Sequence, residues 1–315
     1  MELTTSHRFD DDKRWGKRLQ KIRTKGSSDR DILTINSRVV SEQNKISEKQ
    51  IPNDAVYATA TNKDKASINE GIFAKHVSKT HKKNIKTRPP LHTICIKASN
   101  LLFQTKKRGH FNRKVRDGME KDLIYSSCSD AHVEDIDNKR WDPMLKLYHN
   151  RPLSINSNID VKNCVANGAM CLFKGIILKH EFKQNPFAHM EKIIMDGYAV
   201  NCIEAKQIDS LVVEMIDGNS DPDNPKIMEL KVQTATARIH YPLPLDGPVN
   251  HKTQRIWQSI KLTQFPVNVA NARTVHKLQG RTIKHLVIST WNYTGNWVYV
   301  VLSRYVLRCK ITISL

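Results

Sequence analysis

The run Thr274-Val275-His276-Lys277 has the residue types of a phosphate-binding turn. Thr274, His276 and Lys277 carry small polar or cationic side chains, and their surroundings predict a turn that leads into a helix. The first backbone N–H groups of a helix have no partner within it, so they are free to bind phosphate oxygens. The alternative is a helix cap with a solvated lysine.

A complete site for nucleotide hydrolysis is not recognisable in the chain. The loop Gly-x-x-x-x-Gly-Lys-Ser/Thr, which cradles phosphates and binds magnesium, is absent: Gly16-Lys17 has no glycine five residues earlier, and Gly280 lacks the spacing. No acidic pair for magnesium is identifiable. His76 and His81 are five residues apart, not the four of two zinc ligands on one helix face. Nor is there a Gly-x-Ser-x-Gly elbow.

Positive charge dominates the composition, because 51 lysines and arginines stand against 31 acids and give a net charge of +20. Such a charge attracts polyanions and makes nucleic acid the leading class of partner. The stretch from Lys75 to Arg116 has no acid between its ends. It is either a solvated loop or a contact to a phosphate backbone whose affinity falls steeply with salt.

The cysteines and the apolar residues bear on the compartment. The 6 cysteines are scattered, without a Cys-x-x-Cys pair, so we expect no structural zinc site and a reducing environment. The first residues lack an apolar signal core, and no apolar run reaches the ~18 residues of a membrane helix. We therefore expect an intracellular, soluble protein without a membrane partner.

The two ends of the chain predict an α/β fold. Trp15, Leu19 and Ile22 follow the acids Asp10 to Asp12 at an apolar helical spacing that predicts a helix ending at Gly26. Ser28 with Asp31 predicts a capping box for a second helix. Residues 55–59 are β-prone and lead through a polar turn into a helix after Asn62, which is the basic unit of an α/β sheet. A strand at 283–289 and a final helix around 297–304 follow later.

The middle of the chain predicts short strands. Residues 152–155 and 169–173 are β-rich and are separated by Asn167-Gly168, which favours a tight turn. Further strand-like runs, such as 211–215, continue between turn signals. We therefore expect an inserted β-rich module over residues 164–262, between the α/β parts 1–163 and 263–315.

Four blocks of the sequence resemble motifs of the Pif-type, RecD-like superfamily-1 DNA helicases. The similar blocks, in chain order, are Ser6-His7-Arg8-Phe9 with Trp15-Gly16, residues 58–62 with Ile68-Asn69, residues 145–158 with Asn167-Gly168, and residues 274–280 with 299–304. They span nearly the whole chain. The Thr-x-His-Lys-x-Gln-Gly run followed by Leu-Ser-Arg is the most specific of them.

The resemblance implies a fold and an activity. It implies the second RecA-like domain of an ATP-dependent DNA helicase, a parallel sheet flanked by helices, with a small SH3-like module inserted. ATP and magnesium are the family's cofactors, but the first RecA-like domain would precede Arg8, so this chain alone is expected to be inactive. Its expected partners are single-stranded DNA or RNA and a separate chain that supplies the first domain. The expected compartment is the nucleus rather than the cytoplasm of a eukaryote, with an organelle left open.

The resemblance also implies roles for particular residues. Arg8 and Arg304 would reach the γ-phosphate, where an arginine stabilises the charge that develops during phosphoryl transfer. Gln279 and Gly280 would lie between DNA and nucleotide. The residues expected at the DNA backbone are Thr59, Asn62, Thr274, His276 and Lys277. For Thr59 and Asn62, a plain turn at the end of a strand is the alternative.

Two other interpretations remain open. The chain is alternatively a non-catalytic protein that binds single-stranded nucleic acid and descends from such a helicase, with the missing phosphate loop as its natural state. The third interpretation is a decaying reading frame of a mobile element, in keeping with the abrupt end after Cys309-Lys310-Ile311.

Overall fold

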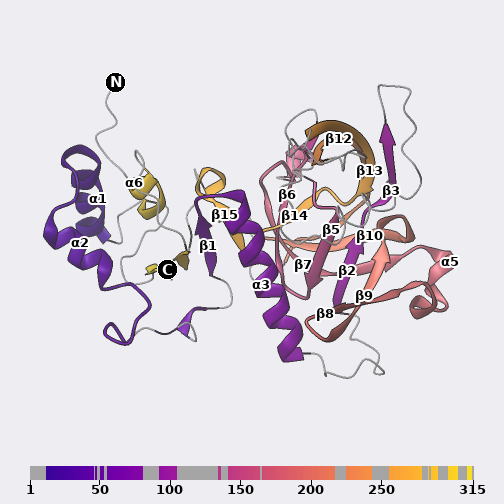
Figure 1. Cartoon of the computed structure of the whole chain (residues 1–315), viewed down its shortest axis with the longest axis horizontal. Helices are drawn as coiled ribbons and strands as arrows, with labels where there is room; N and C mark the ends of the chain where they lie inside the picture. The colour runs from indigo at the N-terminus through magenta and orange to yellow at the C-terminus, as the bar shows by residue number, and fades with distance from the viewer. Residues whose placement is uncertain are drawn as a thin grey trace, which may run out of the picture. The chain divides into compact units, whose positions relative to one another are not determined.

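The chain divides into two compact units. The computed structural model describes residues 12–45, 47, 50–52, 55–80, 92–104, 134–135, 141–163, 165–216, 225–242, 255–278, 283, 285–289, 297–303 and 311–313. Unit 1 comprises residues 1–69 and 271–315, and unit 2 comprises residues 70–270. Unit 1 is therefore assembled from the two ends of the chain, and several of its elements are labelled in Figure 1.

Two helices open unit 1 where the sequence predicted them. They are α1 (Lys13–Lys25) and α2 (Asp29–Asn36). The N–H of Trp15 donates to the carboxylate of Asp12 at 2.9 Å and caps α1. Gly26 ends α1 at a φ of +80°, which glycine adopts without strain. The predicted capping box is also confirmed, because Ser28 and Asp31 bond each other's side chain and backbone.

Asp31 joins the two helices. Its carboxylate accepts a hydrogen bond from Ser28 Oγ at 2.5 Å and forms an ion pair with Arg18 Nε of α1 at 2.9 Å. The hydrogen bond from Ser28 and the nearby Arg18 hold the pKa of Asp31 below its ordinary value. The charged form is thereby stabilised, so this side chain can be buried between α1 and α2.

A parallel sheet with helices packed on it forms the core of unit 1. Its strands, in spatial order, are β15 (Ala272–Thr274), β1 (Val56–Thr59), β16 (Leu286–Ile288) and β17 (Ile311–Ile313). All three pairings are parallel. Apolar residues of α1 and of α6 (Trp297–Leu302) share one buried cluster with Ala58 and Leu286. The predicted α/β class with a parallel sheet is therefore confirmed.

Unit 2 is built mainly from antiparallel strands. One sheet runs β11 (Ile227–Leu230), β10 (Ile208–Met215), β7 (Met170–Leu178), β6 (Pro152–Ile155), β14 (Val267–Val269). A second runs β3 (Ser99–Gln104), β13 (Arg255–Gln264), β12 (Gln233–Pro242), β4 (Glu134–Asp135). A third, mixed sheet runs β5 (Met144–Tyr148), β2 (Thr93–Lys97), β9 (Tyr198–Glu204), β8 (Glu191–Met195). Short helical elements are η3 (Val161–Asn163), α5 (His180–Lys183), η4 (Pro186–His189) and η5 (Ala205–Gln207).

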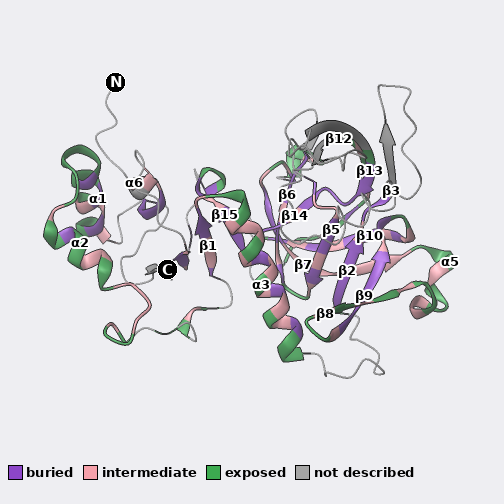
Figure 2. Ribbon diagram, in the orientation of Figure 1, coloured by how far each residue is buried: buried purple, intermediate pink, exposed green. Residues whose placement is uncertain are grey.

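The mixed sheet is covered on both faces. Alternate residues of a strand point to opposite faces, so Ile94 and Ile96 enter the large core shared with the five-stranded sheet, whereas Cys95 faces the other way. There Cys95 packs with Phe73 and Val77, which lie on the helix α3 (Asn62–Thr80). Figure 2 shows β2 and β9 in the colour of buried residues. The order of layers is therefore α3, mixed sheet, five-stranded sheet.

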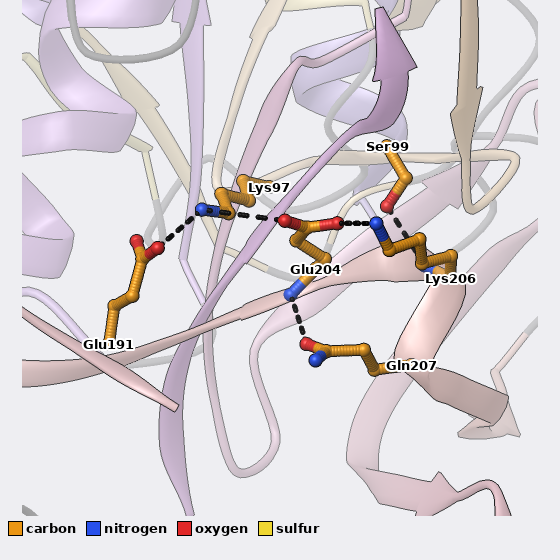
Figure 3. A network of polar contacts seen from close by, with 6 residues as sticks. All are labelled: Lys97, Ser99, Glu191, Glu204, Lys206 and Gln207. Atoms are coloured by element: carbon orange, nitrogen blue, oxygen red, sulfur yellow. Dashed lines mark hydrogen bonds and ion pairs between the residues drawn. The ribbon is translucent and has the colours of Figure 1, made fainter. Parts of the chain in front are cut away.

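A polar network ties one end of the mixed sheet together (Figure 3). Lys97 Nζ of β2 lies 2.8 Å from Glu191 of β8 and 3.8 Å from Glu204 of β9. Glu204 also pairs with Lys206 at 2.7 Å, and the N–H of Lys206 donates to Ser99 Oγ at 3.0 Å. Every charge in the network has an opposite partner. We therefore interpret it as a structural tie between strands.

The predicted segments and the compact units divide the chain differently. Strands β2 and β6 lie in the predicted segment 1–163, yet β2 pairs with β9 and β6 pairs with β7. Strand β14 lies in the predicted segment 263–315, yet it pairs with β6. The domain boundaries and the SH3-like character of the inserted module stay predictions. Among the described helices, none combines the length and apolar character needed to cross a membrane.

Candidate nucleic-acid interface

The carboxyl edge of the parallel sheet brings two of the predicted blocks together. Thr59, the last residue of β1, is the register partner of Thr274, the last residue of β15. On the other side of β1, Ala58 is the partner of Ile288, which ends β16. When the described strands of this sheet are numbered along the chain, their spatial order is 2-1-3-4. Open parallel sheets flanked by helices bind ligands at the carboxyl ends of their strands.

Thr59 holds the turn after β1 from inside. Its side chain is fully buried, and its hydroxyl lies 3.2 Å from each of the carbonyl oxygens of Thr61 and Arg273. The hydroxyl therefore links the end of β1 to the end of β15. In this position Thr59 shapes the strand ends, and its predicted contact with DNA stays a prediction.

Asn62 begins α3 on the surface. The preceding residue, Thr61, accepts the N–H of Asp64 at 3.1 Å and donates to the Asp64 carboxylate at 2.7 Å. This is the local capping that threonine supplies at the start of a helix. Asn62 is exposed beside this cap, so its side chain is available at the carboxyl edge of the sheet.

Asn69 connects α3 to β15 across 203 positions of the chain. Its Oδ1 accepts the N–H of Ala272 at 2.8 Å, and its Nδ2 donates to the carbonyl oxygen of Ala272 at 3.4 Å. Both hydrogen bonds are buried. Asn69 thus fixes the start of the strand that ends at Thr274. The sequence pointed to the block that contains Asn69, but the hydrogen bonds between Asn69 and Ala272 were not predicted.

Ser289, the residue after β16, is hydrogen-bonded to β1. Its N–H and its hydroxyl both donate to the carbonyl oxygen of Ala58, at 3.3 Å and 3.1 Å. These two bonds link the residue after β16 to β1. Ser289 and the buried Arg273 were not predicted as site residues. Both come to lie beside β1 only because strands that are far apart in the sequence pair with it.

The predicted turn into a helix is, in the described part, a single 3-10 turn, η6 (Val275–Leu278). Side chains at i and i+3 eclipse in a 3-10 helix, and here Val275 and Leu278 are both buried. His276 and Lys277 between them are exposed. Lys277 has no ion pair with another described residue, so its charge is available to an anion.

The other predicted site residues have different outcomes. Arg8, Gln279, Gly280 and Arg304 lie outside the described residues. Ser303, which precedes Arg304, is buried, and its hydroxyl donates to the carbonyl oxygen of Val300 at 3.0 Å. This hydrogen bond holds the end of α6.

The part of the chain that the structure describes gives no positive sign of a site for ATP and magnesium, so the expectation that this chain alone holds neither fully stays a prediction. The sequence has no Gly-x-x-x-x-Gly-Lys-Ser/Thr loop. Within the described ranges, no group of three or more His, Cys, Asp or Glu side chains could hold a metal ion. The carboxyl edge instead offers hydroxyl, amide and cationic groups, which suit a phosphate backbone.

Comparison with solved structures shows a fold like that of Pif1 helicases. A Pif1 helicase from Candida albicans matches with a TM-score of 0.52 and 15% identity over 98% of this chain and 55% of that one. A Bacteroides Pif1 helicase in complex with ADP-AlF3 and ssDNA matches with a TM-score of 0.51 and 16% identity over 99% of this chain and 51% of that one. The chain thus spans about half the length of these helicases. No protein-family model matches it, and no curated protein matches its sequence.

Proposed function

We propose that this chain is the second RecA-like part of an ATP-dependent DNA helicase and that it holds single-stranded DNA along the carboxyl edge of its parallel sheet. The observation that carries the proposal is the pairing of Thr59 with Thr274, which places two helicase-like blocks side by side. The Bacteroides helicase of the same fold binds ssDNA and ADP-AlF3. That this chain also binds single-stranded DNA is part of the proposal.

In this proposal the residues at the edge divide into two groups. Lys277 and His276 are exposed and contact the phosphate backbone, with Asn62 and Thr274 beside them. Thr59 and Asn69 are buried and keep the two strand ends in register. Phosphate contacts position a strand without reading its sequence, so we expect little preference between sequences, and RNA is a second candidate strand.

Residues near both ends of the chain are proposed to act at the nucleotide. By resemblance to the family, Arg8 and Arg304 act on the γ-phosphate, and Gln279 and Gly280 lie between nucleotide and DNA. Because these residues include no phosphate loop, we propose that a first RecA-like domain that is not among them holds the nucleotide.

The Lys277→Ala variant is expected to bind a 12-nucleotide single strand about threefold to tenfold more weakly at low salt. Loss of one phosphate contact should also make the slope of log K against log salt shallower by about 0.7. Fluorescence anisotropy over a salt series measures both quantities. Lys192→Ala, which removes an exposed lysine of β8 in unit 2, is the matched control. Equal slopes for the two variants would contradict the proposed interface.

The purified chain alone is expected to show no ATP turnover, with or without single-stranded DNA, because it has no phosphate loop. A phosphate-release assay tests this. Turnover that DNA stimulates and that Arg304→Ala abolishes would show that other residues of this chain hold the nucleotide. Salt-sensitive binding without turnover in any combination of chains would favour the second candidate, a non-catalytic protein that binds single-stranded nucleic acid.

A further inference from the structure

Helix α1 of unit 1 carries a row of lysines along its exposed face. Four exposed lysines follow one another at intervals of four residues, and we call them the lysine row: Lys13, Lys17, Lys21 and Lys25. Residues four apart are neighbours on one face of a helix, and each such step rises about 6 Å along the axis. The row therefore runs the whole length of α1, on the side away from the apolar residues that the helix buries.

The charge of the lysine row is not balanced within the described residues. The helix itself contains no acid, and none of the four lysines forms an ion pair with another described residue. Asp31 of α2 lies close enough to interact with the charge of Lys21. Its carboxylate, however, is buried and already paired with Arg18 at 2.9 Å. The row is therefore a concentration of positive charge that an anion from outside the chain can reach.

The lysine row is unfavourable for the helix that carries it. Like charges four residues apart on a helix repel each other. Lys13 and Arg14 also stand in the first turn, where the helix dipole disfavours cations. Two other cations of α1 do stabilise the fold, because Arg18 forms an ion pair with α2 and Arg23 lies 5.6 Å from the centre of the Tyr299 ring. The lysines make no such contact, so their arrangement suits binding rather than folding.

The side chains beside the lysine row indicate which anion it suits. The other exposed residues of α1 are Arg14, Gln20, Arg23 and Thr24, so the exposed face of this helix has no aromatic ring on which a base could stack. Proteins that hold single strands combine positive charge with such rings. Duplex DNA keeps its bases inside and carries one negative charge per about 1.7 Å of its axis, which is twice the charge density of one strand. A row of lysines without aromatic residues therefore suits a duplex better than a single strand.

We propose that the lysine row of α1 binds the phosphate backbone of duplex DNA. Lysine meets phosphate as a point charge, and contacts to phosphates carry no sequence information directly, so this contact does not read the sequence. The inference goes beyond the proposed function, because it concerns a different nucleic acid and a different part of unit 1. The single strand is assigned to the ends of β1 and β15, whereas the duplex is assigned to α1. Each assignment is tested with its own probe, so either can fail alone.

The test replaces the whole lysine row in the full chain, as Lys13→Gln/Lys17→Gln/Lys21→Gln/Lys25→Gln. Glutamine has nearly the helix propensity of lysine, so α1 should persist. Fluorescence anisotropy with a 20-base-pair duplex at low salt should show binding at least about tenfold weaker than that of the unmodified chain. The slope of log K against log salt should become shallower by about 2–4, because each phosphate contact contributes about 0.9. Binding of 12-mer oligothymidylate should weaken by less than about threefold.

The matched control removes the same number of charges from unit 2. Four exposed lysines of that unit are replaced together, as Lys162→Gln/Lys179→Gln/Lys183→Gln/Lys192→Gln. This variant has the same net charge as the variant of the lysine row, so a general loss of attraction to polyanions affects both equally. We expect the control to bind the duplex within about twofold of the unmodified chain. A loss confined to the variant of the lysine row then belongs to α1.

Two further measurements separate binding from folding. The variant of the lysine row should unfold at the temperature of the unmodified chain or above it, because the substitution removes repulsion between like charges. Acetylation of the unmodified chain, followed by mass spectrometry, should show that the duplex protects the four lysines of the row, which tests the contact without any variant.

Three outcomes would overturn the proposal. The first is no protection of the lysine row, or a loss of duplex affinity no larger than that of the control. The second is an equal loss for the duplex and for oligothymidylate, which would make the row a contact for any nucleic acid strand. The third is binding of poly-L-glutamate that equals binding of the duplex and disappears with the row, which would favour an acidic protein as the partner. None of the outcomes with the duplex depends on Lys277.

Discussion

The Asn69→Ala variant is expected to lose about 2–4 kcal/mol of unfolding free energy in unit 1. Alanine cannot replace either hydrogen bond, so the buried N–H and carbonyl groups of Ala272 would both lose their side-chain partner. A buried polar group without a partner costs about 1–3 kcal/mol. Urea unfolding followed by circular dichroism measures the change.

Asn62→Ala on the same helix is the matched control for this prediction. Asn62 is exposed, so its replacement should change the free energy of unfolding by less than about 0.5 kcal/mol. Because Asn69 holds the strand that ends at Thr274, Asn69→Ala should also weaken binding of single-stranded DNA at temperatures where the variant remains folded. A free energy of unfolding equal to that of Asn62→Ala would show that the bridge contributes nothing.

The Arg151→Ala variant is expected to destabilise unit 2 by about 3–5 kcal/mol, the range of large-to-small replacements at fully buried positions. The guanidinium is fully buried, stacks on Phe73 and Tyr148, and donates through Nη1 to the carbonyl oxygen of Lys146. Truncation would leave a cavity and remove this donor. Thermal unfolding of the full chain, followed by near-ultraviolet circular dichroism, measures the loss.

Arg151→Met separates the packing from the charge. Methionine refills much of the cavity and removes a buried charge, so we expect it to recover at least half of the loss. Burial lowers the pKa of Arg151 from its ordinary value to about 10. Below about pH 10 the group is charged in both the folded and the unfolded state, so the difference between the unmodified chain and Arg151→Met should stay constant from about pH 6 to pH 9. A stable Arg151→Ala variant would contradict the prediction.

Elements with strong local signals could be predicted from the sequence. Helix α1 has its apolar stripe and its stop at Gly26, and α2 has the capping box of Ser28 and Asp31. Strand β1 and the helix after it follow from a β-prone run and a polar turn. In each case the deciding interactions lie within a few residues of one another, so a single sequence contains them.

Features that depend on distant partners could not be predicted. The pairing of β1 with β15 and the bridge from Asn69 to Ala272 join residues more than two hundred positions apart, and no local pattern encodes them. One signal was available for Asn69, because it shares a helical face with the apolar residues Phe73 and Val77, and a polar residue in such a row requires a buried partner.

The bridge between Asn69 and Ala272 has a consequence for the order of folding. These residues stand directly beside the two points at which the chain leaves and re-enters unit 1, so unit 2 begins and ends at nearly the same place. Bringing the ends of so long an unfolded segment together would cost chain entropy that a short parallel sheet repays poorly. A folded unit 2 removes that cost in advance, because it presents its two ends already close together. We therefore expect the parallel sheet to assemble last, on a loop that the inserted unit has already closed.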